Sequence, residues 1–284
     1  MIGMDKLLLV DGSNLLFQMF FGMPARIVNK SGRAIHGTMG FVGALLKIIR
    51  MTKPTHVAVL FDGEHENARA ELNADYKANR IDYSEVAESE NPFSQLADIY
   101  AALDFLQFKH AETVDCETDD WIASYARSFG GETEIVISSF DSDYFQLLSE
   151  SVSLLRYRGE RTVVCTPAYL REKFGITPAQ YADFKSLVGD ASDNLRGAEK
   201  VGPKTAALLL GRFATLEGVL QNAEKIERIS VRAAILRDAE RLRTNYDLIK
   251  LKGENEVPFS LGELLFGGNL PTVSETLKGI GLLP

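Results

Sequence analysis

The sequence predicts an α/β fold, with a central parallel sheet flanked by helices and a mostly helical C-terminal part. Residues 6–11 (KLLLVD), 55–62 (THVAVLFD) and 133–141 (TEIVISSFD) are short runs rich in Val, Ile and Leu, and each ends at or near an aspartate. Such runs are typical of strands buried on both faces of a parallel sheet. Helical patterns separate them, as right-handed β–α–β units require.

The first of these helices is expected over residues 37–50. Its sequence places Phe41, Leu45, Ile48 and Ile49 on one face, the pattern of a helix that packs against a core.

Two further helices are expected before the third strand, at about 94–106 and 117–129. In the latter, Trp121, Ile122 and Tyr125 fall at core spacing.

Residues 64–92 differ from their surroundings because they carry many charges and few large aliphatic side chains. They are expected to form a mobile, solvent-exposed connection with partial helix. Residues 178–284 are expected to be mostly helical, with short amphipathic segments broken by Gly and Pro that pack on the sheet.

Composition bounds the class of protein. The 284 residues are 45% hydrophobic and 25% charged, which is ordinary globular usage. No apolar run approaches the roughly 20 residues that a membrane-spanning helix needs, and the N-terminus lacks a secretory pattern. With only Cys116 and Cys165, a disulfide framework or a cysteine-rich zinc site is excluded, so a cytoplasmic, reducing location is expected.

The aspartates at the strand ends are the first functional signal. Ligands bind beyond the carboxyl ends of parallel strands, and Asp11, Asp62 and Asp141 would all lie on that edge. Acids that are distant along the chain are therefore predicted to converge. More acids stand nearby in CETDDW, FDSDY and VGDASDN, namely Glu117, Asp119, Asp120, Asp143, Asp190 and Asp193.

Spacing within these motifs suits metal binding. Glu117 and Asp120 share a helix face at i, i+3, and Asp190 and Asp193 have the same spacing, so each pair can offer oxygen ligands to one ion. Carboxylates without clustered His or Cys favour Mg²⁺ or Mn²⁺ over zinc. The net charge of −8 argues weakly against nucleic-acid binding, but setting these nine acids aside moves it to +1.

Each acid taken singly has an ordinary structural interpretation. A lone Asp at a strand end or helix start is most often a cap or turn residue, and an acidic first turn suits the helix macrodipole. Their joint placement favours shared metal ions, because so many acids on one edge would repel one another without cations.

The connection also carries basic and aromatic residues. Lys77 and Arg80 lie one helical turn apart and can meet neighbouring phosphates, with Arg69 nearby, while Tyr76 offers a ring on which a base can stack. An ordinary solvated charged helix is the alternative.

Residues 197–210 (GAEKVGPKTAALLL) read as a Gly-containing turn followed by a helix start, where backbone N–H groups suit phosphate. With Lys200 and Lys204 close by, this indicates a helix–hairpin–helix that grips duplex backbone, although an ordinary helix–helix turn is the alternative. The segment is not a P-loop, because the first required glycine is missing.

Together these motifs resemble the bacterial and phage 5′-3′ exonuclease/flap endonuclease family, which includes the N-terminal 5′ nuclease domain of DNA polymerase I. The motifs LLLVDGSN, VLFDG, RAELNADYKANR, CETDDWIAS, SSFDSDYFQLL and GDASDN followed by VGPKTA occur in family order over roughly residues 5–250.

The resemblance implies a PIN-like fold, with a helical arch over about 64–92 and a helix–hairpin–helix subdomain. It divides the chain into a catalytic domain at 1–177 and a DNA-binding helical region at 178–284. It implies that DNA is hydrolysed at 5′ ends and flaps by a two-metal mechanism. Lys77 and Arg80 would steer the scissile phosphate. Lys200, Gly202, Lys204 and Thr205 would contact duplex DNA at a hairpin that often binds K⁺.

The resemblance also implies two sets of metal ligands. The first acid group comprises Asp11, Asp62, Glu117, Asp119 and Asp120, and the second comprises Asp141, Asp143, Asp190 and Asp193. A monomer acting in DNA replication or repair is expected, with no polymerase domain in these 284 residues.

Two departures from the family pattern bear on the site. Gln18 stands where an Arg is common, which leaves one phosphate contact missing or replaced, and Lys200 stands at the hairpin's usual first glycine, with Arg196 at a usual proline. The potassium site is therefore open to question.

Three other functions remain open at this point. A PIN-like ribonuclease would also gather acids on a sheet edge, but it would not need residues 178–250. A junction-binding protein would bind without cleaving. A phosphatase built on Asp141 and Asp143 would leave Asp190, Asp193 and the hairpin unexplained.

Overall fold

The computed structural model describes residues 4–63, 69, 72–73 and 75–284. Its centre is a six-stranded sheet in which five strands are parallel and the edge strand β6 is antiparallel. The predicted parallel sheet is thus confirmed, with an antiparallel edge added. The strands, in spatial order, are β3 (Lys109–Glu112), β2 (His56–Phe61), β1 (Lys6–Asp11), β4 (Glu134–Ser138), β5 (Val152–Arg156) and β6 (Val163–Cys165).

Both faces of the sheet are buried, which explains the continuous apolar runs. In β1, Leu7 and Leu9 point into one core and Leu8 and Val10 into the other, as the two-residue period of a strand requires. Helix α5 (Thr118–Phe129) contributes to the first core. The helices on the opposite face are α1 (Gly12–Gly22), α2 (His36–Thr52) and α4 (Leu96–Phe105).

The helices expected from sequence are present, and their apolar faces are buried against the sheet. Phe41, Leu45, Ile48 and Ile49 of α2 are all buried, as are the core positions of α5. Within the described residues, short 3-10 turns cover seven further segments, which are Tyr83–Glu85, Glu88–Glu90, Pro92–Gln95, Asp143–Leu147, Pro178–Gln180, Ala223–Lys225 and Leu261–Leu264.

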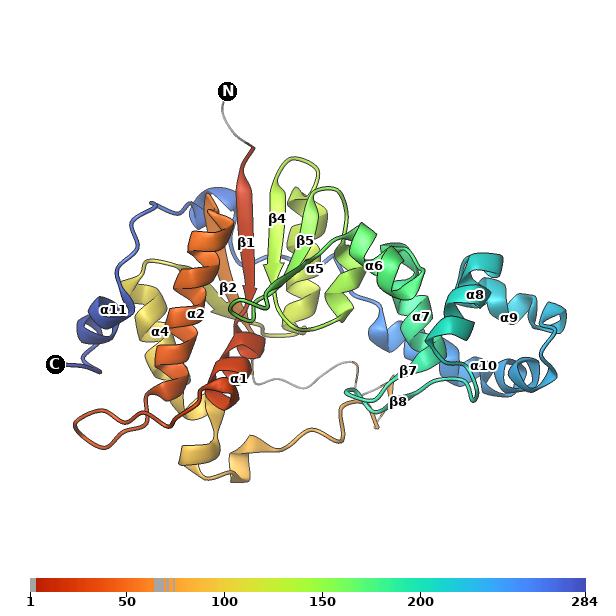
Figure 1. Cartoon of the computed structure of the whole chain (residues 1–284), viewed down its shortest axis with the longest axis horizontal. Helices are drawn as coiled ribbons and strands as arrows, with labels where there is room; N and C mark the ends of the chain where they lie inside the picture. The colour runs from red at the N-terminus through yellow and green to blue at the C-terminus, as the bar shows by residue number, and fades with distance from the viewer. Residues whose placement is uncertain (1–3, 64–68, 70–71, 74) are drawn as a thin grey trace.

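The helical region extends from one side of the sheet (Figure 1). Its long helix packs along α7, and side chains from both regions share one core, so the region is continuous with the sheet as expected. Its elements are α6 (Pro167–Phe174), α7 (Tyr181–Val188), β7 (Gly189–Asp190), β8 (Leu195–Arg196), α8 (Pro203–Phe213), α9 (Leu216–Gln221) and α10 (Ile229–Ile249).

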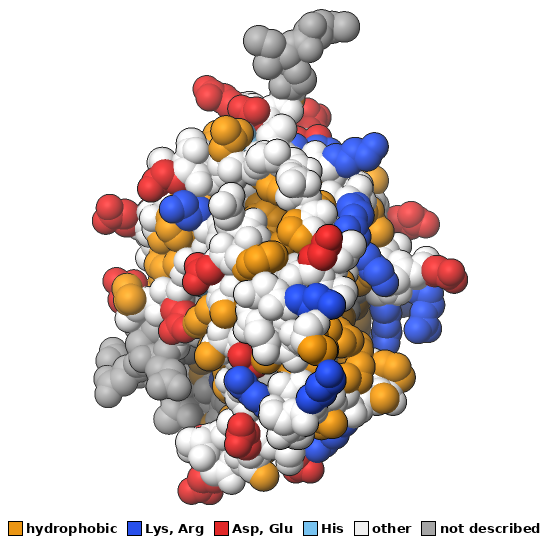
Figure 2. All heavy atoms as spheres, turned by 90° about the vertical axis from the view of Figure 1, so that its left-hand side faces the viewer, with side chains coloured by type: hydrophobic (Ala, Val, Ile, Leu, Met, Phe, Trp, Pro, Cys, Tyr) orange, Lys and Arg blue, Asp and Glu red, His pale blue; other side chains and the backbone are white. Residues whose placement is uncertain are grey.

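The C-terminal helix α11 (Val273–Gly279) lies at the other end of the molecule, against α2 and α4 (Figure 1). Residues after about 265 thus contact the sheet-bearing part. The division at 177 remains a prediction. The face around α11 mixes acids, bases and apolar side chains without one dominant charge (Figure 2). None of the helices in the described part of the chain has the length and hydropathy needed to span a bilayer.

Candidate metal centre

The predicted convergence of strand-end acids is confirmed. Asp11 ends β1 and is buried, and its charge interacts with those of Asp62 and Asp141 from the ends of β2 and β4. Burial, followed by the neighbouring charge of Asp62, raises the pKa of Asp11 to about 7. Three carboxylates from three strands thus share the carboxyl edge of the sheet.

Donors hold the Asp11 carboxylate in place. Its Oδ1 accepts a 2.9 Å hydrogen bond from the Asn14 N–H, as a helix N-cap does. Its Oδ2 accepts from Ser139 Oγ at 2.9 Å and from the Tyr144 hydroxyl at 3.1 Å. Sequence analysis did not identify Ser139 or Tyr144, since neither has a distinctive local pattern.

Two glycines allow the backbone to pack closely here. A Cβ on Gly12 would overlap the Phe61 ring, and one on Gly63 would overlap the Thr113 carbonyl oxygen. Between them, Asp62 accepts a 2.9 Å hydrogen bond from the Thr118 N–H. This bond ties the end of β2 to the start of α5.

The start of α5 brings the remaining acids of the first group to the same edge. Glu117 occupies the N-cap position, and Asp119 and Asp120 lie in the first turn. Burial raises the pKa of Asp119, although the nearby Arg69 guanidinium opposes that rise. Asp120 Oδ1 also accepts a 2.7 Å hydrogen bond from the Lys252 N–H, so this acid helps to anchor the segment after α10.

Two cations of the connection lie on these acids. Arg69 is buried and forms ion pairs with Glu117, with Asp119 at 3.3 Å and with Asp120 at 2.7 Å. Lys77 also forms an ion pair with Glu117. The acids at the start of α5 are therefore partly neutralised by residues that lie at least 40 positions earlier in the chain.

The expectation of a solvent-exposed connection is wrong for two of its residues. Tyr76 is only 7% exposed, among Ala182, Leu195 and Leu248, and Arg69 is 3% exposed. Paired acids on α5 and an apolar niche on the helical region, neither visible in the local sequence, bury them. Of the partial helix expected over 64–92, the described residues contain the 3-10 turns Tyr83–Glu85 and Glu88–Glu90, while residues 64–68, 70–71 and 74 lie outside the described residues.

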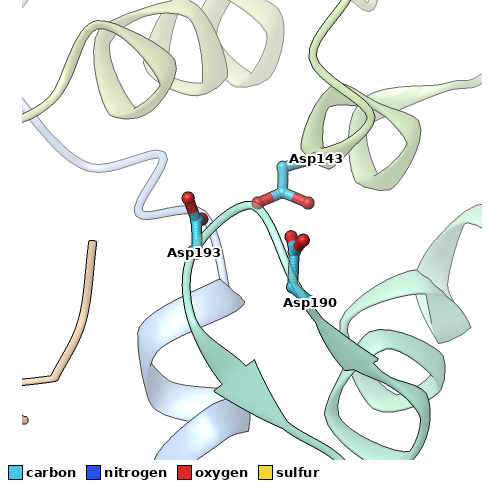
Figure 3. Close-up of side chains that lie close together, drawn as sticks. All are labelled: Asp143, Asp190 and Asp193. Carbon is cyan, nitrogen blue, oxygen red and sulfur yellow. The ribbon is translucent and has the colours of Figure 1, made fainter. Parts of the chain in front are cut away.

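The second acid group has the geometry of a metal site. One carboxylate oxygen from each of Asp143, Asp190 and Asp193 lies within 4.8 Å of the others, and the three side chains point toward one another (Figure 3). Asp143 Oδ1 is buried without a hydrogen-bond partner. Burial, then the charge of Asp141, raises the pKa of Asp143 to about 7. An oxygen-only set with an unsatisfied buried oxygen fits a hard divalent cation.

The fourth acid of this group borders the same space. Asp141 accepts a 2.8 Å hydrogen bond from the Asp143 N–H, and both Asp141 and Asp190 line a 240 Å³ pocket. Arg80 and Asn14 line the same pocket.

Lys185 of α7 is a part of the second group that the sequence analysis missed. Its ammonium forms an ion pair with Asp190 and lies 3.6 Å from Asp143 Oδ1. Burial disfavours the charged acid, but the hydrogen bonds from Lys185 and Ser192 and the charge of Lys185 together outweigh it, so the pKa of Asp190 is lowered. The only local signal is a lysine five residues before an aspartate, which is too common to be informative.

The connection is fastened to the second group by its backbone. The Lys77 N–H donates to the Asp193 carbonyl at 3.1 Å, and Asn194 Nδ2 donates to the Asp75 carbonyl at 2.9 Å. Arg80, with a 57% exposed side chain, reaches Asp193 Oδ1 at 3.1 Å. Residues 75–80 therefore bridge the two acid groups.

The helix–hairpin–helix elements are present as α7, the turn and α8. Gly202 caps α8, and Lys204 and Thr205 lie in its first turn. Lys200 adopts a left-handed φ of 64°, the conformation that favours glycine. Gln18 lies on α1, where its Nε2 donates to the Tyr157 carbonyl at 2.7 Å.

Acids from the strand ends, the start of α5 and the β7–β8 turn thus gather at one end of an α/β fold, with a pair of helices beside them. Comparison with known families identifies the class. Residues 6–175 match the 5′-3′ exonuclease N-terminal resolvase-like domain, and residues 176–269 match the 5′-3′ exonuclease C-terminal SAM fold. The chain belongs to the 5′-3′ exonuclease family.

Curated relatives are DNA polymerases I. The chain is 34% identical to that of Thermus thermophilus over 91% of its own length and 30% of the relative's. It is 34% identical to that of Deinococcus radiodurans over 96% of its length and 28% of the relative's. The chain thus spans less than a third of these proteins.

Solved structures share the fold. A bacteriophage T5 5′-exonuclease with bound zinc matches with a TM-score of 0.73 at 22% identity, covering 87% of this chain and 90% of that one. A T5 flap endonuclease with DNA and metal ions matches with a TM-score of 0.72 at 19% identity, covering 97% and 93%.

Proposed function

We propose that this protein is a structure-selective 5′ nuclease that hydrolyses DNA phosphodiesters at 5′ ends and flaps, using two divalent ions. The observation that carries the proposal is the second acid group. Three of its carboxylates lie within 4.8 Å of one another, beside a pocket that Asp141, Asp190 and Asp193 help to line. Family membership and the DNA-polymerase relatives support the same activity.

Mg²⁺ is the proposed ion, with Mn²⁺ as a substitute, because every candidate ligand atom is a carboxylate oxygen. We assign one ion to the first acid group and one to the second. Such a pair, when bound, supplies an activated water and stabilises both the attacking and the leaving oxygen of an in-line displacement.

The chain's own cations are assigned to the substrate. Lys77 and Arg80 lie at the rim that joins the two acid groups, where they can contact the scissile phosphate and the one beside it. For Arg69 and Tyr76, the proposed contact with DNA requires the connection to leave its present position, because both side chains are buried. The proposal therefore includes a movement of Arg69 and of residues 75–80 when DNA binds.

The hairpin is assigned to duplex DNA downstream of the cut. Lys200, Gly202, Lys204 and Thr205 surround the exposed start of α8, where first-turn N–H groups can meet a phosphate. A Cβ on Gly202 would meet no protein atom within 4 Å, so the fold does not require this glycine. A close phosphate, and K⁺ held by hairpin carbonyls, are the proposed reasons for it.

The remaining assignments are a monomer, a cytoplasmic location and a role in DNA replication or repair. The free thiols of Cys116 and Cys165 support a reducing compartment. The relatives' name, DNA polymerase I, supports the replication and repair role.

The direct test is cleavage of a 5′-labelled DNA flap in Mg²⁺ by wild type and Asp141→Asn, with a matched RNA flap alongside. The proposal expects wild type to cut DNA near the junction and the variant to lose most of that rate. Preferred cleavage of RNA would indicate a ribonuclease. Flap binding without cleavage in either Mg²⁺ or Mn²⁺ would indicate a junction-binding protein.

A further inference from the structure

Lys185 lies inside the space that the second acid group offers to a metal. Its side chain is 12% exposed, and its ammonium contacts Asp190 directly and lies 3.6 Å from Asp143 Oδ1. Among the described residues, it is the buried cation that touches both acids. The other cation at this group, Arg80, is largely exposed and reaches only Asp193.

An ion bound among the three carboxylates must share them with this ammonium. The carboxylate oxygens lie within 4.8 Å of one another, and Mg²⁺ binds oxygen at about 2.0–2.1 Å, so the ion would sit a few ångström from Nζ. Two cations at that separation repel each other strongly in a partly buried site. Ion binding therefore requires the ammonium to give up Asp190 or Asp143.

The ammonium already has one partner other than the two acids. Ser142 Oγ lies 3.5 Å from Nζ and borders the 240 Å³ pocket. The helix that carries Lys185 is held independently of the acids, since Asp183 accepts a 2.7 Å hydrogen bond from the Leu216 N–H and Ser186 Oγ donates to the Ala182 carbonyl. The side chain can therefore swing while its backbone stays fixed.

We propose that Lys185 is a positioning residue that competes with the divalent ion for Asp143 and Asp190 and so weakens the second metal site in the DNA-free protein. This inference rests on the proposed function, because it needs the second acid group to bind an ion. Displaced toward Ser142, the ammonium faces the pocket, where a substrate phosphate is a suitable partner.

The test is a titration of the DNA-free protein with Mn²⁺. Binding is measured from the electron paramagnetic resonance signal of the Mn²⁺ that stays free. Lys185→Met keeps the side-chain length without the charge and is expected to tighten one site at least roughly tenfold. Lys185→Arg keeps the charge and is expected to leave that site weak. Lys173→Met, which alters an exposed lysine of α6, is the matched control and is expected to match wild type.

Asp193→Asn separates the two possible failures. If this substitution removes one site from wild type but Lys185→Met leaves its affinity unchanged or weaker, Lys185 is only structural and the inference is wrong. If Asp193→Asn alters neither wild type nor Lys185→Met, the second group holds no ion and the proposed two-ion function fails.

A melting curve provides an independent readout. Without Lys185, Asp143 and Asp190 repel each other in EDTA, so Lys185→Met is expected to melt lower than wild type and to gain more stability from Mn²⁺. A gain from Mn²⁺ equal to that of wild type would contradict the inference.

Discussion

The two acid groups obtain their counter-charges in different ways. Arg69 and Lys77, which neutralise the first group, come from a connection that lies outside the sheet and crosses its edge. Lys185, which neutralises part of the second group, belongs to the helix that directly precedes the ligand Asp190. Under the proposed movement of the connection on DNA binding, the first set of cations leaves the acids, whereas Lys185 can only swing.

This difference suggests how the two ions would be controlled. At the first group, the cations withdraw if DNA moves the connection, which frees Glu117 and Asp119 together. At the second group, the competing charge is always present and only its position changes. Both arrangements keep buried carboxylates partnered when no ion is bound, which limits the cost of burying like charges.

The largest expected effect is on catalysis and falls equally on both groups. Asp119→Asn and Asp143→Asn should each reduce Mg²⁺-dependent flap cleavage by about 10³-fold, because each removes a ligand charge that holds an ion at the reacting phosphate. Rates on a labelled flap provide the measurement. Asp104→Asn, an exposed change on α4, is the control and should cleave like wild type. A large loss from only one of the two would mean that only one group is catalytic.

A large stability effect is expected at the first group. Arg69→Met should destabilise the protein in EDTA by about 3–5 kcal/mol, because it leaves buried acids without a partner. Urea unfolding measures this, and Mg²⁺ should restore most of the loss. Arg127→Met removes an exposed pair with Glu254 and should cost less than about 1 kcal/mol. Equal costs for the two variants would show that Arg69 is not a needed counter-charge.

The pH dependence of stability should depend on Asp11. Its pKa is about 7 in the folded protein and 3.8 ordinarily, so the folded state keeps a proton that the unfolded chain has lost. Raising the pH from about 4 to about 7 therefore destabilises the metal-free wild type through this group, and Asp11→Asn escapes that loss. The stability of the variant relative to wild type should rise through this window, by at most about 4 kcal/mol, and then level off.

Urea unfolding at several pH values, in EDTA and in Mg²⁺, measures this difference. Mg²⁺ should abolish the rise, because the ion compensates the charge of Asp11. If the difference in stability between Asp11→Asn and wild type does not change with pH in EDTA, the burial of this carboxylate is contradicted.

The smallest stability effect is expected at the exposed cation of the second group. Arg80→Gln should change stability by less than about 1 kcal/mol, because the Arg80 side chain is 57% exposed. It should instead weaken DNA binding. The slope of the logarithm of the DNA-binding constant against the logarithm of the salt concentration should become smaller in magnitude by about 1. Fluorescence anisotropy of a labelled flap over a range of KCl concentrations tests this. An unchanged slope would mean that Arg80 does not contact phosphate.

The sequence predicts three of the strands that are buried on both faces, but not β5, whose Leu154 and Leu155 pack into opposite cores. Strands β1, β2 and β4 are continuous apolar runs, and their terminal acids converge because parallel strands end on one edge. Strand β3 escapes prediction because it is an edge strand of sequence KHAE, with little apolar surface. In β6, Val163 and Val164 are exposed, so its short run gives no clear signal.

At the candidate site, the convergence of the acids could be predicted from sequence, but their counter-cations could not. The acids occur in compact motifs, whereas Arg69 meets acids about 50 residues away and Lys185 is an ordinary lysine of an amphipathic helix. Burial of Tyr76 likewise depends on an apolar niche formed by α7, β8 and α10. Such tertiary partners leave no periodic pattern in the chain.

The central claim is that the two acid groups hold two separate ions. Anomalous diffraction from crystals soaked in Mn²⁺ tests it most directly. The account predicts two peaks, one beside Asp11, Asp62 and Asp119, and one among Asp143, Asp190 and Asp193. A single peak at saturating Mn²⁺, or peaks away from these carboxylates, would contradict it.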